Sequence, residues 1–183
     1  MPELVVDFIT SLDGYGAADG WPGYWGLEGP EYLAWLAERP EADSTVLMGA
    51  NTYRLMSGFA AQGEPGTDGM AALSKVVFSR TLTEPLEWAN TTLVNRDAVE
   101  AVREMKDEGT TSLRTMGSLS LSRSLLQAGL ADRFRVVVFP VITGATGRDR
   151  IYDGYPDVSL TMVDHRTFDD RIQLLEYVPT VIE

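Results

Sequence analysis

Residues 114–147, RTMGSLSLSRSLLQAGLADRFRVVVFPVITGATG, decide the fold of this chain. They predict a strand from Leu113 to Met116, a turn at Gly117-Ser118, a helix with leucines at helical spacing, and a second strand from Val136 to Phe139. Gly129 stands where a helix C-terminal glycine is expected. The second strand is an unbroken apolar run, which is typical of a strand covered on both faces.

The turn at Gly117-Ser118 is the part of this stretch that points to chemistry. It lies at the carboxyl end of a strand and opens a helix, and helix N-termini hold phosphates because their free N–H groups carry partial positive charge. A second unit of this kind follows the strand from Thr45 to Met48, where residues 49–52 turn into a short helix with Asn51 as the expected N-cap. Ligands gather at the carboxyl ends of strands in open α/β sheets, so both turns are candidate phosphate sites. The alternative is that each glycine only makes a tight turn.

Composition limits the classes of function. The 183 residues predict a single domain, and a net charge of −12 argues against non-specific binding to nucleic acid, which needs a basic face. The chain has no cysteine, which excludes disulfides, thiolate nucleophiles and cysteine zinc sites. We interpret the one histidine, His165, as structural, and we expect no metal site.

The sequence also predicts where the protein is found. No apolar run approaches the length of a membrane span, and the N-terminus, MPELVVDFIT, lacks the basic region of a signal peptide. We therefore expect a cytoplasmic protein that does not contact a membrane.

Strands and helices alternate along most of the chain, which predicts an α/β fold with a mostly parallel sheet and helices on both faces. The other expected strands span residues 4–9, 45–48, 75–79 and 91–94, one helix runs from Pro30 to Pro40, and another begins with a capping box at Asp97 and Glu100 and ends at Gly109. The last two strands, 159–168 and 171–178, form an antiparallel hairpin around Asp169-Asp170.

Three segments, 14–29, 59–69 and 144–157, are expected to be loops. The first is rich in aromatic residues and is either a binding loop or a small core packed onto the sheet. Neither a G-x-G-x-x-G fingerprint after the first strand nor a P-loop is present, so the usual dinucleotide and mononucleotide motifs are absent.

Several stretches together resemble the dihydrofolate-reductase-like superfamily. They are Ser11 to Gly14 (SLDG), Val46 to Tyr53 (VLMGANTY), Lys75 to Leu82 (KVVFSRTL) and the segment MGSLSLSRSLLQAGLADRF with FPVITGATG. The branch they resemble is the reductase domain of the bacterial riboflavin biosynthesis deaminase/reductase and its stand-alone relatives. The resemblance covers nearly the whole chain in the right order. It implies one three-layer domain over residues 1–183 with a sheet of about eight strands, without a deaminase half.

The resemblance further implies that NADPH binds across the strand ends. The cofactor-binding residues it implies are Gly49, Asn51, Thr52, Ser79, Arg80, Met116, Gly117, Ser118, Leu119 and Ser120. Arg80 is placed near the adenosine 2′-phosphate, a task that suits the bidentate guanidinium. The sequence departs from the family pattern at two positions. Ser118 replaces the second glycine of a pair, where its hydroxyl would act as a donor, and Ala50 replaces a basic residue, which leaves Arg80 to read the 2′-phosphate.

At the substrate end, the resemblance implies Ser11 and Asp13 as the catalytic candidates and Thr10, Trp25 and Tyr53 as substrate-binding residues, with Trp21 in the same aromatic loop. No general acid stands out, so a bound water would protonate the product. The expected reaction is hydride transfer from NADPH to a small heterocyclic or carbonyl compound, such as one like 5-amino-6-(5-phosphoribosylamino)uracil.

Three alternatives remain open at this stage: a non-catalytic nucleotide-binding protein, a purely structural oligomeric domain, and a dihydrofolate reductase. The last is disfavoured because the position of that enzyme's helical carboxylate falls at Leu33, while Glu31 lies on a different helical face. By analogy with relatives of this type, we expect a homodimer that pairs through the sheet edge.

Overall fold

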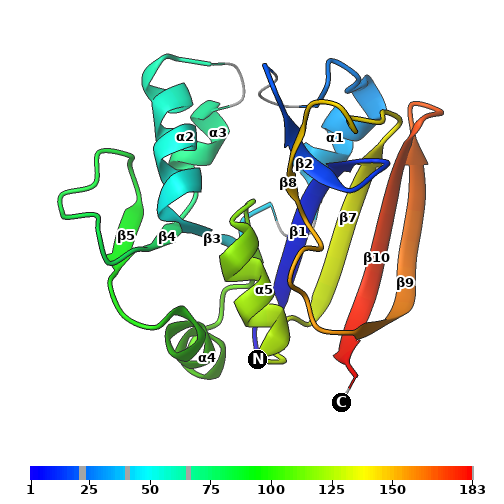
Figure 1. The fold of residues 1–183 in the computed structure, drawn as a ribbon. Helices are drawn as coiled ribbons and strands as arrows, with labels where there is room; N and C mark the ends of the chain where they lie inside the picture. The colour runs from blue at the N-terminus through cyan, green and yellow to red at the C-terminus, as the bar shows by residue number, and fades with distance from the viewer. Residues whose placement is uncertain (21–23, 40–41, 65–66, 183) are drawn as a thin grey trace.

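The computed structural model describes residues 1–20, 24–39, 42–64 and 67–182 (Figure 1). Trp21 and Pro40, which the sequence analysis singled out, lie outside the described residues. The helices are α1 (Pro30–Glu38), α2 (Ala50–Ala61), α3 (Thr67–Ala72), α4 (Ala98–Glu108) and α5 (Leu119–Gln127). The strands are β1 (Leu4–Ser11), β2 (Tyr15–Ala18), β3 (Thr45–Gly49), β4 (Lys75–Phe78), β5 (Thr91–Val94), β6 (Leu113–Thr115), β7 (Arg133–Phe139), β8 (Gly147–Arg150), β9 (Val158–Phe168) and β10 (Ile172–Val181).

Within the described residues, eight strands form one sheet in the order β5-β4-β3-β6-β1-β7-β10-β9. The six strands from β5 to β7 are parallel to one another, and β10 and β9 are antiparallel to their neighbours. The predicted fold class, a mostly parallel sheet that ends in an antiparallel hairpin, is confirmed. Asp169, Asp170 and Arg171 connect the two strands, and the first two have positive φ, as the central residues of a tight hairpin turn between twisted strands often do.

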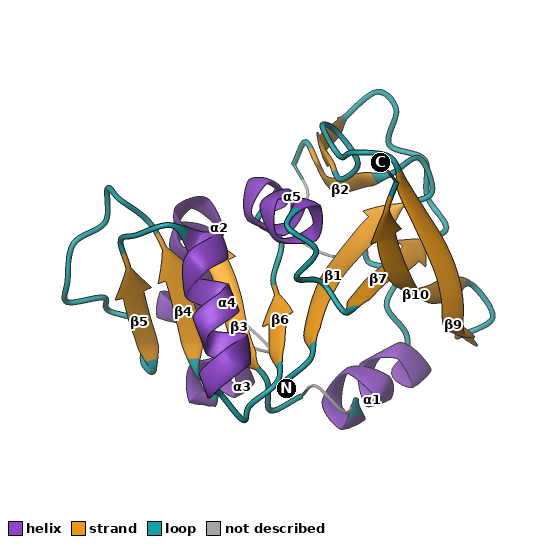
Figure 2. Ribbon diagram, turned by 90° about the horizontal axis from the view of Figure 1, so that it is seen from below, coloured by secondary structure: helices purple, strands orange, loops and turns teal. Residues whose placement is uncertain are grey.

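Helices cover both faces of the sheet, and the alternation of side chains along each strand decides which helix they meet. Leu4, Leu47 and Leu113 pack against α4 and α5. On the other face, the α2 and α3 side chains pack against Val46 and Met48, while α1 packs against β7 and β10. Figure 2 shows α1 and α5 on opposite sides of the sheet.

Two of the segments expected to be loops contain strands. β2 lies in segment 14–29 and pairs with β8 from segment 144–157, and together they form a separate two-stranded sheet. This pairing joins residues about 130 positions apart, so no local pattern in either segment predicts it. The aromatic part of the first segment forms the small packed core that the sequence analysis considered: Tyr24 and Trp25 pack against Phe139.

The segment after β3 also differs from its prediction. α2 is a helix of 12 residues whose N-cap is Gly49, and Asn51 lies inside the first turn and accepts a hydrogen bond from Arg54. The segment 59–69, expected to be a loop, contains the end of α2 and the start of α3. Tyr53, Met56 and Ala60 lie at helical spacing and pack onto the sheet, which outweighs the Gly- and Ala-rich composition.

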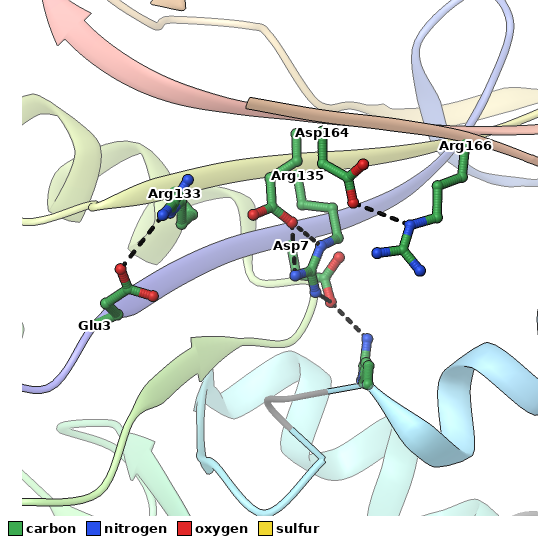
Figure 3. A network of polar contacts seen from close by, with 8 residues as sticks. Glu3, Asp7, Arg133, Arg135, Asp164 and Arg166 are labelled. Atoms are coloured by element: carbon green, nitrogen blue, oxygen red, sulfur yellow. Dashed lines mark hydrogen bonds and ion pairs between the residues drawn. The ribbon is translucent and has the colours of Figure 1, made fainter. Parts of the chain in front are cut away.

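A buried network of charges ties α1 to the sheet (Figure 3). The carboxylate of Asp7, in the middle of β1, lies 2.9 Å from the guanidinium of Arg39 and 3.8 Å from that of Arg135. Arg135 in turn lies 2.7 Å from Glu176 on β10, and the Trp35 ring faces both guanidinium groups. Breaking such a buried pair leaves an uncompensated charge, so the network fixes the end of α1 over β1, β7 and β10.

The start of α1 is capped from the far end of the chain. The carboxylate of Asp169, in the β9–β10 turn, accepts hydrogen bonds from the backbone N–H groups of Glu31 and Tyr32, both at 3.1 Å. The Glu31 carboxylate accepts a hydrogen bond of 2.6 Å from the Asp169 N–H. A side chain at Gly29 would begin 2.2 Å from the Asp169 carboxylate, so the close approach requires glycine there.

We predict that Asp169→Ala lowers the free energy of unfolding by about 1–2 kcal/mol more than Asp170→Ala does, because only the first variant removes a helix cap. Asp170 is the matched control, since both residues have positive φ and both alanines carry the same backbone penalty. Urea titration monitored by circular dichroism measures the difference. Equal losses in the two variants would contradict a capping role for Asp169.

Candidate functional site

The order of strands brings two helix starts together. β6 pairs with β3 in parallel, with Leu47 opposite Thr115, so both strands end at the same edge of the sheet. α2 begins directly after β3, and α5 begins after β6 and the Gly117-Ser118 turn. The two glycine turns singled out in the sequence are therefore neighbours in the structure.

The two helix starts are in direct contact through Ser118. Its hydroxyl oxygen accepts a hydrogen bond of 2.8 Å from the N–H of Gly49, the N-cap of α2. The same hydroxyl lies 2.9 Å from the hydroxyl of Thr52 and 3.1 Å from the Met116 carbonyl oxygen. In this structure the Ser118 hydroxyl thus binds protein groups, and the Gly49 N–H is already satisfied.

The turn before α5 has an unusual backbone. Gly117 and Ser118 have φ values of 54° and 56°, two successive residues in the left-handed region. For Ser118 this conformation costs about 1–2 kcal/mol, and its three polar contacts offset that cost. Gly117 is exposed, and a Cβ at this position would lie at contact distance, 3.4 Å, from the Thr52 hydroxyl, so glycine is favoured here by its φ and not by lack of space.

Apart from the Ser118 hydroxyl on the Gly49 N–H, no side chain of the described residues caps these two helix starts, and neither receives a carboxylate. By contrast, α1 is capped by Asp169, and α4 by Asp97, which accepts a hydrogen bond of 3.0 Å from the N–H of Glu100 as predicted. The first-turn N–H groups of a helix have no partner within the helix. The α2 and α5 starts therefore offer adjacent sets of donors that suit a doubly charged anion such as a pyrophosphate.

Arg80 lies beside these helix starts in the sheet order. Gly49 on β3 is paired with Phe78 on β4, and Arg80 follows Phe78 by two residues at the same edge. The Ser79 hydroxyl accepts hydrogen bonds from the N–H groups of Thr81 and Leu82, both at 3.1 Å, which fixes the turn. Arg80 is exposed, so its guanidinium is available to an anionic ligand.

At the ends of β1 and β7, three polar residues form a network. The Ser11 hydroxyl donates a hydrogen bond of 2.6 Å to the Asp13 carboxylate, which also accepts one of 3.1 Å from the Thr143 N–H. The Thr143 hydroxyl lies 3.3 Å from that of Ser11, and both side chains are buried. Sequence reasoning missed Thr143, because only the fold brings it across 130 residues to Asp13.

The network lowers the pKa of Asp13. The hydrogen bond from Ser11, with a smaller contribution from Thr143, holds the pKa of Asp13 below its ordinary value of 3.8. Asp13 is therefore ionised at neutral pH and accepts hydrogen bonds, and it does not donate a proton in this state.

The three predicted substrate-binding residues have different surroundings. Thr10 is buried at the end of β1, next to Ser11. Trp25 is partly buried against Phe139, whose partner in the sheet is Ser11. Tyr53 is placed in the core instead: it is 7% exposed, and its hydroxyl accepts a hydrogen bond from the Glu87 N–H.

The remaining predicted residues lie around the α5 start. Met116 packs partly into the core, and Leu119 and Ser120 form the first turn of α5. Together with Gly117, the donors of α2, and Arg80, these residues fit the phosphates of a dinucleotide, since they supply backbone N–H groups and a guanidinium where no acidic cap competes.

Among the described residues, no group of three or more histidine or acidic side chains could hold a metal ion. Within the same ranges, no helix has the length and apolar character needed to cross a bilayer.

We predict that Asp13→Asn is less stable than the wild type at neutral pH and that this difference shrinks below pH 3.8. A carboxylate whose pKa is lowered on folding stabilises the folded state above its unfolded-state pKa, and that contribution is lost as the pH falls through the lower, folded-state pKa. Urea midpoints measured across this range test it. A difference that stays constant from neutral pH to well below 3.8 would show that Asp13 is not held as a carboxylate.

The comparisons with known proteins agree with this architecture. The uncharacterized protein YyaP of Bacillus subtilis (strain 168) is 26% identical over 181 residues, which are 96% of this chain and 94% of that protein. A protein of Shewanella sp. PV-4 that is provisionally assigned to riboflavin biosynthesis has the same fold, with a TM-score of 0.76 at 22% identity over 97% of this chain and 99% of that chain.

A longer protein shares the fold over part of its length. The diaminohydroxyphosphoribosylaminopyrimidine deaminase/5-amino-6-(5-phosphoribosylamino)uracil reductase of Thermotoga maritima aligns with a TM-score of 0.68 at 17% identity, over 98% of this chain and 57% of that chain. The family described as the RibD C-terminal domain matches residues 2–174. Because this match extends over nearly the whole sequence, the chain belongs to the RibD C-terminal domain family, as the resemblance predicted.

Proposed function

We propose that this protein is an NADPH-dependent reductase that transfers hydride to a small heterocyclic or carbonyl compound. The observation that carries the proposal is the pair of adjacent helix starts, α2 and α5, which Ser118 joins and which receive no carboxylate from the described residues. Membership of the RibD C-terminal domain family supports it, because the Thermotoga maritima protein that shares the fold is named a reductase of 5-amino-6-(5-phosphoribosylamino)uracil. A compound of that kind is our first candidate substrate.

The cofactor would be held by groups that offset the charge of the chain. With a net charge of −12, the protein repels an anionic ligand unless local donors compensate. The first-turn N–H groups of α2 and α5 and the Thr52 hydroxyl would hold the pyrophosphate, and Arg80 would pair with the 2′-phosphate. When bound, the nicotinamide supplies the hydride.

At the substrate end, the chain orients and accepts hydrogen bonds. Ser11 and Thr143 hold the Asp13 carboxylate, and an ionised carboxylate there binds N–H or O–H groups of a substrate. Because Asp13 is ionised at neutral pH, a water molecule is our candidate proton donor. The partly buried Trp25 and Tyr24 limit access of water beside Phe139.

The structure gives no support to dihydrofolate as the substrate. The position at which the resemblance would require a carboxylate is Leu33, an apolar residue. Its side chain is 46% exposed on α1. Glu31, the nearest carboxylate in the sequence, accepts the Asp169 N–H in the β9–β10 turn. Non-catalytic nucleotide binding is the second candidate, because no general acid stands out among the predicted site residues. A test with the candidate uracil compound separates the two, since only a reductase oxidises NADPH, which is followed by the loss of absorbance at 340 nm.

We also propose that two copies of the chain associate through the open face of the β9–β10 hairpin. Leu160 and Met162 are 42% and 49% exposed, and their cross-strand partners are Pro179 and Tyr177. None of these four residues is charged, although the chain has 27 acidic residues. An exposed apolar strip without charges is suited to a second copy of the same chain. Both copies are strongly acidic, and contact through this strip would not bring their negative charges together.

We predict that Arg80→Ala weakens the binding of NADPH by about tenfold or more and leaves the binding of NADH within about twofold, because only NADPH carries the 2′-phosphate that pairs with arginine. Isothermal titration calorimetry measures both affinities. Arg103→Ala, which removes an exposed arginine on α4, is the control and keeps the wild-type preference. An equal loss for both cofactors would contradict the assignment of Arg80.

We predict that Met162→Glu shifts the protein from dimer to monomer, because two carboxylates would be desolvated at the interface. Ser159→Glu is the matched control, since it adds the same charge to β9, outside the apolar strip formed by Leu160 and Met162. Size-exclusion chromatography with light scattering gives the mass. A wild-type protein that remains monomeric at high micromolar concentration would overturn the proposal.

A further inference from the structure

We propose that Ser118 is a positioning residue that determines cofactor affinity. Its hydroxyl joins the two helix starts, a link that we call the strut, and directs the Thr52 hydroxyl toward the bound anion. This inference rests on the proposed function and deepens it. It concerns a residue that the resemblance implies only as one member of the cofactor-binding set.

The first step of the argument is the direction of the hydrogen bonds. The Gly49 N–H donates to the Ser118 hydroxyl oxygen at 2.8 Å. The Ser118 hydroxyl has one proton of its own, and of its two acceptors the Thr52 hydroxyl oxygen, at 2.9 Å, is nearer than the Met116 carbonyl oxygen, at 3.1 Å. The three groups form a chain in which each member donates to the next, and donors arranged in this way polarise one another.

The second step is the free end of this chain. The Thr52 hydroxyl accepts from Ser118 and donates to no acceptor among the residues that the structure describes. Its proton is therefore available to a ligand next to the first turns of α2 and α5. A hydrogen bond from this hydroxyl to a phosphate oxygen is charge-assisted, which makes it stronger than one between neutral groups.

The third step corrects the role expected for Gly49. The resemblance implies Gly49 as a residue that contacts the cofactor, but in the structure its N–H is satisfied by Ser118. Its contribution instead passes through the Ser118 and Thr52 hydroxyls. Because Ser118 occupies the Gly49 N–H, that donor is not available to a ligand. The same contact fixes the spacing of the two helix starts before any ligand binds. Less conformational ordering is then required on binding.

The test compares four variants by two measurements, the urea midpoint of the ligand-free protein and the dissociation constant for NADPH by calorimetry. Ser118→Ala keeps the Cβ and the backbone strain but removes the hydroxyl. We expect a lower urea midpoint and roughly tenfold weaker binding, the loss of about one hydrogen bond to a charged group. Ser118→Gly lacks the strut as well and is expected to bind more weakly than the wild type.

Thr52 provides the second pair of variants. Thr52→Val removes the terminal donor, and we expect a roughly tenfold weaker affinity with only a small change in the urea midpoint. Thr52→Ser restores the hydroxyl and is expected to bind NADPH within about twofold of the wild type.

Three results would overturn the inference. Tighter binding by Ser118→Gly than by the wild type would show that the side chain obstructs the cofactor. Unchanged affinity in both Ser118→Ala and Thr52→Val would show that the hydroxyl chain does not reach the ligand, and an unchanged urea midpoint in Ser118→Ala would show that there is no strut. A wild-type protein that does not bind NADPH would instead refute the proposed function, while the urea midpoint of Ser118→Ala would still decide whether the strut exists.

Discussion

Parallel pairing between β3 and the three-residue strand β6 is the constraint on which the candidate site depends. β6 follows α4 in the sequence but lies between β3 and β1 in the sheet, so the helix after β6 begins beside the helix after β3. Without this insertion, the α2 and α5 starts would belong to separate parts of the molecule. With it, the Ser118 hydroxyl bridges them, and the ends of β1 and β4 lie on either side with the Ser11–Asp13–Thr143 network and Arg80.

The placement of acidic side chains separates the structural helix starts from the candidate binding site. Asp169 and Asp97 satisfy the first-turn donors of α1 and α4 and so stabilise those helices without a ligand. The α2 and α5 starts have glycine and serine at their N-caps and receive no carboxylate from the described residues. In a chain with a net charge of −12, this leaves unneutralised positive potential at the edge of the sheet where β3 and β6 end.

Local patterns predicted most of the main elements, and long-range contacts account for what was missed. The strands of the eight-stranded sheet, α4 with its cap at Asp97, and both glycine turns follow from residues close in sequence. The β2–β8 pairing, the cap of α1 by Asp169, and the contact of Thr143 with Asp13 each join residues about 130 positions apart. The Ser118 hydroxyl was expected to donate a hydrogen bond to the ligand, but in the structure it accepts one from Gly49. Which of the two it contacts depends on the distance between the α2 and α5 starts, and no local pattern encodes that distance.

The most direct test of the central claim is a backbone amide NMR titration with NADPH. If the two helix starts hold the pyrophosphate together, the amide signals of residues 50–52 and 119–121 shift with the same apparent dissociation constant, because one ligand contacts both sets. Shifts confined to one helix start, or clustered at the opposite edge of the sheet, would contradict the claim that the two form a single site.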